Sequence, residues 1–130
     1  MTCSVDDSSG SAQAISNDIT QIQITMPSNV LEITGINVSA IERILSHADL
    51  QITFNGVFND ASSMSHVVFK DYRTNAGSEL GRTVSIAHSG QTLAEPALLL
   101  TAYNMNRATD GSLTWEVPGM LADGTVPAWS

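Results

Sequence analysis

Apolar and polar residues alternate along three segments of the chain, at the spacing expected of strands that bury one face. Residues 18–26 alternate isoleucine and methionine with glutamine and threonine, and residues 29–36 repeat the pattern after a Pro-Ser turn signal. This arrangement predicts that the two segments pair as a hairpin. Residues 50–58 form a longer alternating run, which favours one strand through Asn55-Gly56, with the glycine at a bulge or close contact, over a hairpin at that pair.

The period of the pattern changes between these strands. Ile41, Ile44 and Leu45 stand at helical spacing, and Ser39 followed by Glu42 fits a capping box. The sequence here predicts a helix of about two to three turns, which needs packing against the body to be stable.

Residues 59–71 admit either a short helix or a short strand, and the spacing favours a short helix or turn. His66 lies there among serines and near Asp71, which raises the question of a catalytic or metal site. The segment lacks any recognised motif, so we interpret it as a joint between structural elements and His66 as a polar residue at that joint.

The second half of the chain returns to strand patterns. Residues 82–90 alternate, residues 91–108 are the most apolar run, and Asp110-Gly111 is a two-residue turn signal. That signal predicts a hairpin between residues 91–108 and the strand that carries Leu113, Trp115 and Val117. The whole pattern predicts a mainly β protein: an antiparallel sandwich or barrel of about six strands with one or two short flanking helices.

The first residues of the chain lack such a pattern. Residues 1–18 are rich in serine, aspartate and glycine, and their large aliphatic residues are Val5 and Ile15. Such a segment does not offset its ordering entropy alone, so we expect a flexible arm that is either plainly disordered or adds to a neighbour's sheet edge. The folded domain is then expected over residues 19–130. Cys3 in the arm is expected to be solvent-exposed.

The charge of the chain is sparse and negative. Five Lys and Arg residues against thirteen Asp and Glu residues give a net charge of −8. A nucleic-acid-binding surface needs clustered cations, so the sequence argues against one, and an acidic surface repels DNA. The absence of a signal-peptide pattern and of a long apolar run predicts a soluble protein made in the cytoplasm, without a membrane partner.

The sequence also lacks an arrangement of residues that would carry catalysis. His47 and Asp49 are two positions apart, which suits a metal only if the backbone places them together, and no paired cysteines or histidine motifs accompany them. Trp115 and Trp129 are expected to be packing residues. We therefore predict no enzyme activity, no catalytic residues, no cofactor and no metal.

Two stretches, residues 38–70 ("VSAIERILSHADLQITFNGVFNDASSMSHVVFK") and residues 82–129 ("RTVSIAHSG … DGTVPAW"), carry a resemblance. With the polar arm before them, they resemble the major tail tube proteins of long-tailed, siphovirus-type bacteriophages. The resemblance extends from about Asp18 to Ser130.

The resemblance implies a β-sandwich with a flanking helix, six copies in a ring, and rings stacked into a hollow tube in the virion. Its partners would be further copies of itself, a tape measure protein and a tail terminator, and DNA would pass through without specific binding. Six chains would bring about −48 to a ring, which repels phosphates. The polar positions of residues 21–25, 50–54 and 112–117 suit a lining, and Glu32 and Glu116 are the candidate lumen-facing acids. Candidate contacts between subunits are Val5, Ile15, Arg43, Tyr72, Arg73 and Glu79.

Two other classes fit the same pattern. A different virion protein on a similar sandwich, such as a capsid decoration protein or a minor tail protein, would form trimers or monomers on a shell. A ligand-binding β-domain, such as a carbohydrate module, would present an exposed platform of aromatic side chains. Aromatic residues make up only 5% of this chain, so few are available for such a platform. Sixfold assembly would favour the tube.

Overall fold

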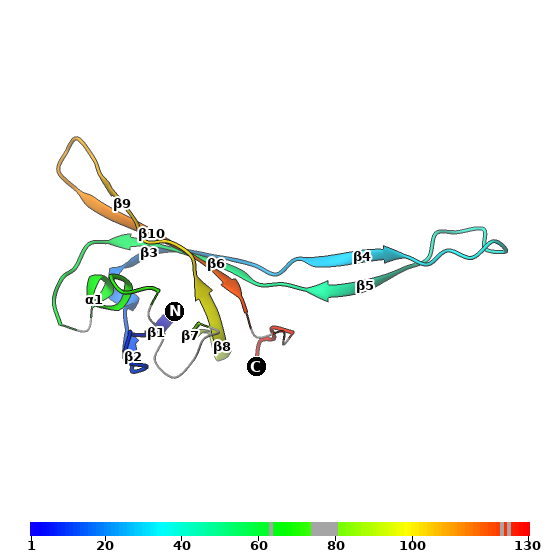
Figure 1. Cartoon of the computed structure of the whole chain (residues 1–130), viewed down its shortest axis with the longest axis horizontal. Coiled ribbons are helices and arrows are strands. Elements are labelled where there is room, and N and C mark those ends of the chain that lie inside the picture. The colour runs from blue at the N-terminus through cyan, green and yellow to red at the C-terminus, as the bar shows by residue number, and fades with distance from the viewer. Residues whose placement is uncertain (63, 74–80, 123, 125) are drawn as a thin grey trace.

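A computed structural model describes residues 1–62, 64–73, 81–122, 124 and 126–130 of the chain (Figure 1). These residues form ten strands: β1 (Thr2–Asp6), β2 (Ala12–Ala14), β3 (Ile19–Thr25), β4 (Ser28–Glu32), β5 (Arg43–Ala48), β6 (Gln51–Val57), β7 (Arg82–His88), β8 (Gln91–Leu100), β9 (Asn104–Arg107) and β10 (Leu113–Leu121). A 3-10 helix (Ser16–Asp18) and one α-helix, α1 (Ser65–Phe69), complete the described elements. The prediction of a mainly β, antiparallel fold is confirmed.

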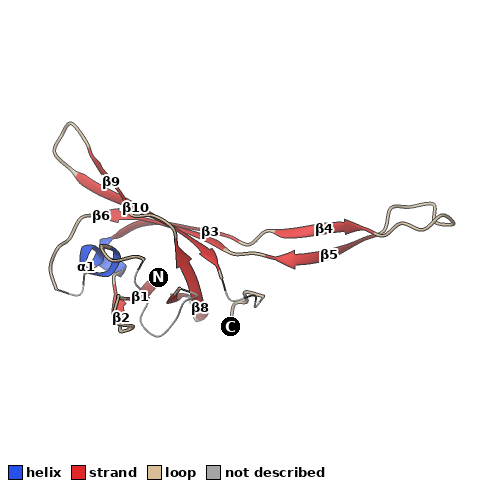
Figure 2. Ribbon diagram, viewed as in Figure 1, coloured by secondary structure: helices blue, strands red, loops and turns tan. Residues whose placement is uncertain are grey.

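Eight strands form one antiparallel sheet in the order β2-β1-β7-β8-β10-β6-β3, with β9 also paired to β10. Figure 2 shows β8 crossing the direction of β10 steeply, and the two strands pair only between Leu98–Leu100 and Gly119–Leu121. Gly119 makes the crossing possible, because a Cβ there would lie 2.7 Å from the Leu98 side chain. The sheet thus folds over into two layers, β9-β10-β6-β3 and β2-β1-β7-β8.

The core lies between these two layers. Ile52 and Phe54 of β6 face Val84 and Ile86 of β7, and all four are at most 1% exposed. They belong to one apolar cluster, which Phe69 of α1 closes at one end. The predicted alternation in residues 50–58 and 82–90 is therefore confirmed, because each of these strands buries one face and exposes the other.

The strand β6 passes through Gly56 without turning, as predicted. A Cβ at this position would lie 2.2 Å from the backbone oxygen of Asp18 and 2.5 Å from the ring of Trp115. Trp115 in turn donates a hydrogen bond from Nε1 to the oxygen of Val57 at 2.7 Å. Because Gly56 has no side chain, the indole of Trp115 packs directly against its backbone.

The N-terminal segment differs from the expected flexible arm. β1 pairs with both β2 and β7, and Val5 and Ile15 are completely buried in the core. The turn between β1 and β2 is held by Asp7, whose Oδ1 accepts hydrogen bonds from the Ser9 hydroxyl at 2.6 Å and the Ser11 amide at 3.0 Å. The pairing with β7, the two buried aliphatic residues and the turn at Asp7 together order this polar segment.

The region expected to contain a helix is a hairpin of strands. β3 continues through Pro27 into β4, β5 continues into β6, and β4 pairs with β5, so the predicted pairing of residues 18–26 with 29–36 and the predicted helix near Ile41 are both wrong. In the helix, Ile41, Ile44 and Leu45 would have needed a core to cover them. In the strands, Ile44 and Leu45 point to opposite faces and both are exposed.

Other sequence predictions agree with the structure. The short helix favoured within residues 59–71 is α1, and the Asp110-Gly111 turn joins β9 to β10 in a hairpin. The Ala108 amide donates to the Ser112 oxygen at 2.9 Å across this turn.

Replacement of Gly56 by alanine tests the packing of the two layers. We expect Gly56→Ala to lower the free energy of unfolding by about 1–3 kcal/mol, because the methyl group displaces the Trp115 ring or the Asp18 backbone. Gly35→Ala is the matched control, since a Cβ at Gly35 meets its nearest neighbour, Val38, at an ordinary 3.7 Å. Chemical denaturation of both variants measures the difference. Equal stability of Gly56→Ala and wild type would contradict the close packing.

Candidate assembly surfaces

The histidines and carboxylates that raised the question of chemistry have separate structural partners. His47 Nδ1 contacts the Ser46 hydroxyl at 3.1 Å, whereas Asp49 Oδ1 accepts a hydrogen bond from the Leu50 amide at 2.8 Å. Within the described residues, no three metal-ligating side chains gather at one place. Among the described residues, no helix is long and apolar enough to cross a membrane.

His66 packs in an aromatic cluster that fastens α1 to the sheet. Its Nδ1 lies 3.1 Å from the Tyr103 hydroxyl, and its ring centroid lies 4.8 Å from that of Phe58. Phe69 of the same helix packs against Trp115 at 5.0 Å between centroids. Desolvation raises the pKa of Tyr103, so its hydroxyl stays protonated beside the histidine. These contacts give His66 a packing role at the joint.

Two buried charged residues hold the ends of α1. Asp18, only 4% exposed, accepts hydrogen bonds from the Ser65 amide and the Asn59 side chain, both at 3.0 Å. Arg82, 2% exposed, donates to the backbone oxygens of Val68 and Asp71 at the other end of the helix. Burial lowers the pKa of Arg82. One end of α1 is therefore bonded to the 3-10 helix and the other end to β7.

The most exposed apolar surface is on the β4–β5 arm, which we define as residues 28–48. Figure 1 shows the arm extending away from the body as a narrow ribbon. Its large aliphatic side chains are between 40% and 99% exposed: Val30, Leu31, Ile33, Ile36, Val38, Ile41, Ile44 and Leu45. Because Val30 pairs with Leu45 and Leu31 with Ile44 in adjacent rows, both faces of the arm are apolar.

The arm is joined to the body by continuous backbone. The Asp49 amide donates to the Pro27 oxygen at 2.9 Å, which bridges the two strands where the arm leaves the body. Near the tip, the Glu42 amide donates to the Thr34 hydroxyl at 2.9 Å and the Ile33 amide to the Glu42 oxygen at 2.9 Å. The arm is thus a hydrogen-bonded ribbon, and the body of the same chain does not bury its aliphatic side chains.

The outward side of the β9-β10-β6-β3 layer is polar, and we call it the polar face. One row of residues crosses its four strands in register: Asn104, Glu116, Asn55 and Gln21. A hollow of about 370 Å³ lies over this row. The residues Gln23 and Thr53 continue the polar side chains in the next row.

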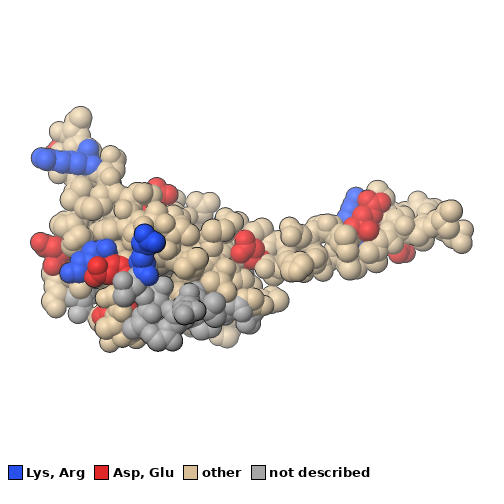
Figure 3. All heavy atoms as spheres, viewed as in Figure 1, with Lys and Arg blue, Asp and Glu red and all other residues tan. Residues whose placement is uncertain are grey.

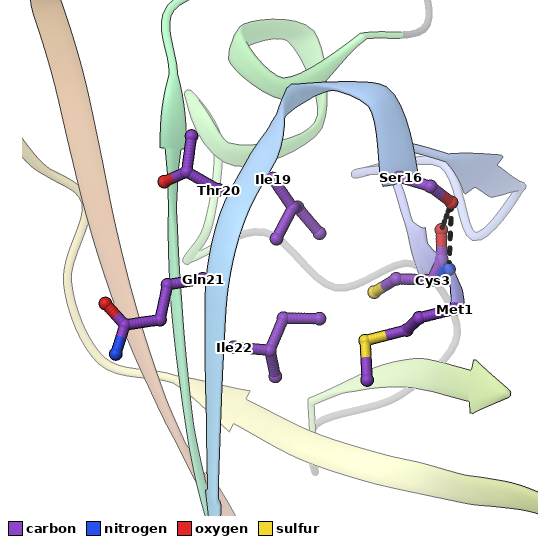
Figure 4. Close-up of a pocket in the computed structure, with 7 residues that line it drawn as sticks. All are labelled: Met1, Cys3, Ser16, Ile19, Thr20, Gln21 and Ile22. Carbon is purple, nitrogen blue, oxygen red and sulfur yellow. Dashed lines mark hydrogen bonds between the residues drawn. The ribbon is translucent and has the colours of Figure 1, made fainter. Parts of the chain in front are cut away.

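A smaller hollow of about 180 Å³ lies between β1 and β3, where the two layers meet without pairing. Figure 4 shows Met1, Ile19 and Ile22 lining it, with the Ser16 hydroxyl bonded to the backbone of Cys3. Cys3 is 3% exposed, and burial raises the pKa of its thiol to about 12. The expectation of an exposed thiol is wrong, and the sulfur is an uncharged packing group.

Comparisons with known proteins identify the fold. No protein-family model matches the sequence, and no curated protein matches it. A chain in the structure described as the tail of an empty GTA particle, refined with C6 symmetry, matches all of this chain and 93% of its own length, with a TM-score of 0.69 and 19% identity. A chain in the virion of a native gene transfer agent (GTA) particle matches 92% of this chain and 88% of its own length, with a TM-score of 0.63 and 16% identity.

The chain has the fold of a phage-like tail protein. The similarity extends over nearly the whole of both chains, so it includes the arm as well as the body. At this level of sequence identity it concerns the fold, and it confirms the expected resemblance at that level.

The structure places the residues expected at subunit contacts in different environments. Val5 and Ile15 are inside the chain's own core. Arg43 is exposed on the arm and Arg73 is exposed after α1, whereas Tyr72 is half-buried and packs against the core. The remaining candidate, position 79, lies outside the described residues.

The two acids expected to face a lumen lie on different surfaces. Glu32 is exposed on the arm directly opposite Arg43, and Glu116 is exposed on the polar face. Figure 3 shows that charged side chains on this side of the molecule gather at a few places, including the arm and the tip of the β9–β10 hairpin, while most of the visible surface is uncharged.

Sequence reasoning missed the aliphatic residues of the arm and the two charged residues that hold α1. Asp18 and Ser65 are 47 positions apart, so no local pattern connects them. The arm carried one usable signal: aliphatic residues occupy both odd and even positions around residues 30–45, which is typical of a ribbon covered on both faces by other molecules.

Replacement of Arg82 tests the attachment of α1. We expect Arg82→Lys to lower the free energy of unfolding by about 2 kcal/mol, because a lysine ammonium does not reproduce the planar fork that reaches several backbone oxygens. Arg107→Lys, on an exposed strand, is the matched control and should be neutral. Thermal and denaturant unfolding measure both variants, and equal effects would contradict the role assigned to Arg82.

Proposed function

We propose that this chain is a structural subunit of a phage-like tail, in which six copies form a ring and rings stack into a hollow tube that conducts DNA. The observation that carries the proposal is the arm, with aliphatic side chains exposed on both faces. The similarity in fold to a chain of a tail refined with C6 symmetry supports the sixfold arrangement.

A second copy of the chain is the natural cover for the arm. Burial of one large aliphatic side chain contributes about 1.5–3 kcal/mol, and eight of them are exposed here. An isolated two-stranded ribbon is marginally stable in water, so the arm gains most of its order from a partner. Because the arm extends away from its own body, the contact joins two different surfaces, and such contacts generate rings or stacked filaments.

The sheet edges support closure into a ring. Within the described residues, β3 ends the strand order on one side, and β9 pairs on one side only, with β10. Exposed strand edges invite pairing with another chain, and a closed ring removes them. Side-by-side copies joined at β3 and β9 would extend the β9-β10-β6-β3 layer from one subunit to the next.

The remaining parts of the proposal come from the resemblance to tail tube proteins. The subunit belongs in the virion, assembles in the host cytoplasm, and is not an enzyme. Further copies of the chain are its main partner, with a tape measure protein inside the growing tube and a terminator at its end. DNA passes through during ejection without specific binding.

A substitution on the arm separates assembly from folding. Leu45 is 71% exposed in the single chain, so Leu45→Asp should leave the unfolding free energy of the monomer unchanged. The same substitution removes apolar burial between copies and should raise the concentration at which rings or tubes appear by about tenfold or more. Negative-stain electron microscopy and sedimentation over a concentration series measure that threshold.

Val126→Asp is the matched control, because Val126 is 70% exposed and lies outside the arm. It should assemble at the wild-type threshold. Assembly of Leu45→Asp at that same threshold would contradict the role of the arm. A wild-type protein that remains monomeric or trimeric at every concentration would contradict the ring and the tube.

A further inference from the structure

The two faces of the β4–β5 arm differ in the arrangement of their charges. Directly opposed residues of an antiparallel pair share a face, so Val30 and Leu45 lie on one face together with Glu32 and Arg43. We call this side the Val30 face. Glu32 and Arg43 are themselves directly opposed, so the acid on this face has a base beside it on the neighbouring strand.

The other side of the arm, which we call the Leu31 face, carries an acid opposite an aliphatic residue. Leu31 and Ile44 form one row of this face. The next row contains Ile33 and Glu42, where the Ile33 amide donates to the Glu42 oxygen. All four side chains are exposed, and neither row contains a Lys or Arg. A surface that covers the Leu31 face must therefore supply apolar contact and a cation, since burial of an unpaired carboxylate is costly.

The β9–β10 hairpin has a matching surface of the opposite charge. Met105 pairs with Trp115 and Arg107 pairs with Leu113, so these four residues share the side of the hairpin opposite the polar face. Trp115 belongs to the core, whereas Met105 is 45% exposed and Arg107 is also exposed. The apolar side of the layer thus continues past the core. We call Met105, Arg107 and Leu113 the hairpin underside.

We propose that the Leu31 face of the arm packs on the hairpin underside of a second copy, with Glu42 beside Arg107. The inference rests on the proposed tube and names the surface that receives the arm. Both surfaces belong to two-stranded ribbons, which pack face to face as sheets do. On each ribbon an uncharged row is followed by a row with one aliphatic residue and one charge, and the two charges have opposite sign.

Arg107 is the cation of the chain that fits this position. Of the five Lys and Arg residues, Arg43 lies on the Val30 face and Arg82 is buried. Lys70 directly follows α1 and has no strand neighbours. Arg107 lies on a strand, and the residue two positions before it on the same face is the exposed Met105.

The arm and the hairpin are placed for a head-to-tail contact. Figure 1 shows them at opposite ends of the molecule, where each extends past the body. A contact between two different surfaces repeats from copy to copy, so each chain would give one arm and receive another. The contact uses a face of β9, and the free edge of β9 therefore stays available for pairing within a ring.

Reversal of both charges tests the contact. We expect Glu42→Arg and Arg107→Glu, each alone, to raise the concentration at which tubes appear by about tenfold or more, because each places like charges side by side. The double variant restores the pair with its signs exchanged and should assemble within about threefold of wild type. The defect of each single variant should shrink as salt screens the repulsion. Sedimentation and negative-stain electron microscopy measure the thresholds.

Arg73→Glu is the matched control, because Arg73 is an exposed cation that borders a hollow of about 360 Å³ together with Leu99. Its net charge equals that of Arg107→Glu, so a general effect of charge would appear in both variants. Arg73→Glu should neither hinder assembly nor rescue Glu42→Arg. All three positions are exposed, so circular dichroism and denaturant unfolding should show every monomer folded with wild-type stability.

A cysteine pair reports the same contact directly. Assembled tubes of Ile33→Cys/Leu113→Cys are treated with a bis-maleimide that spans about 10 Å, the distance between packed sheets. We expect a ladder of linked chains on a denaturing gel. Leu45→Cys/Leu113→Cys is the control and should give no ladder, because Leu45 lies on the Val30 face. The native Cys3 is 3% exposed and stays out of the reaction.

Three results would overturn the inference while leaving the tube itself standing. Assembly of Arg107→Glu at the wild-type threshold would mean that the hairpin underside does not receive the arm. Rescue of Glu42→Arg by Arg73→Glu in place of Arg107→Glu would move the contact to the hollow beside α1. Equal ladders from the two cysteine pairs would mean that the Leu31 face does not face the hairpin. Absence of tubes in the wild type would instead overturn the proposed function.

Discussion

The crossing of β8 over β10 is the constraint on which the two-layered body depends. Leu98 stands at this crossing between two glycines, since a Cβ at Gly119 would lie 2.7 Å from its side chain and a Cβ at Gly81 would lie 2.4 Å from its backbone oxygen. The close approach lets one continuous sheet turn over and enclose its own core. The two layers that enclose the core have their positions because the sheet folds at this point.

The short helix shows how buried charge can organise a joint without chemistry. Asp18 and Arg82 are both nearly inaccessible to water. Asp18 accepts a hydrogen bond from the Ser65 amide at one end of α1, and Arg82 donates to the Val68 and Asp71 oxygens at the other end. Buried charged groups are costly unless they are fully hydrogen-bonded, which explains why they define one geometry. Neither residue was singled out from the sequence, and their contacts show that both have a structural role.

The sequence predicted those elements whose order comes from the chain's own core. Strands such as β6 and β7 bury one face, and that burial leaves an alternating pattern that can be recognised. The polar faces of residues 21–25 and 50–54 were predicted for the same reason. The arm could not be predicted in this way, because Ile44 and Leu45 are both exposed in the single chain and their pattern matches a helix equally well. The N-terminal strands depend on contacts with β7, about 80 positions away, which no local pattern contains.

The direct continuation of the arm into the body has a mechanical consequence. β4 is an extension of β3, β5 is an extension of β6, and β6 lies between β10 and β3 in the sheet. Ladder hydrogen bonds run perpendicular to antiparallel strands, so a pull along the arm loads them in shear. Under shear, the bonds on both sides of β6 share the load and must break together. In a subunit held by its arm, tension would therefore pass through β3 and β6 into the core of the body.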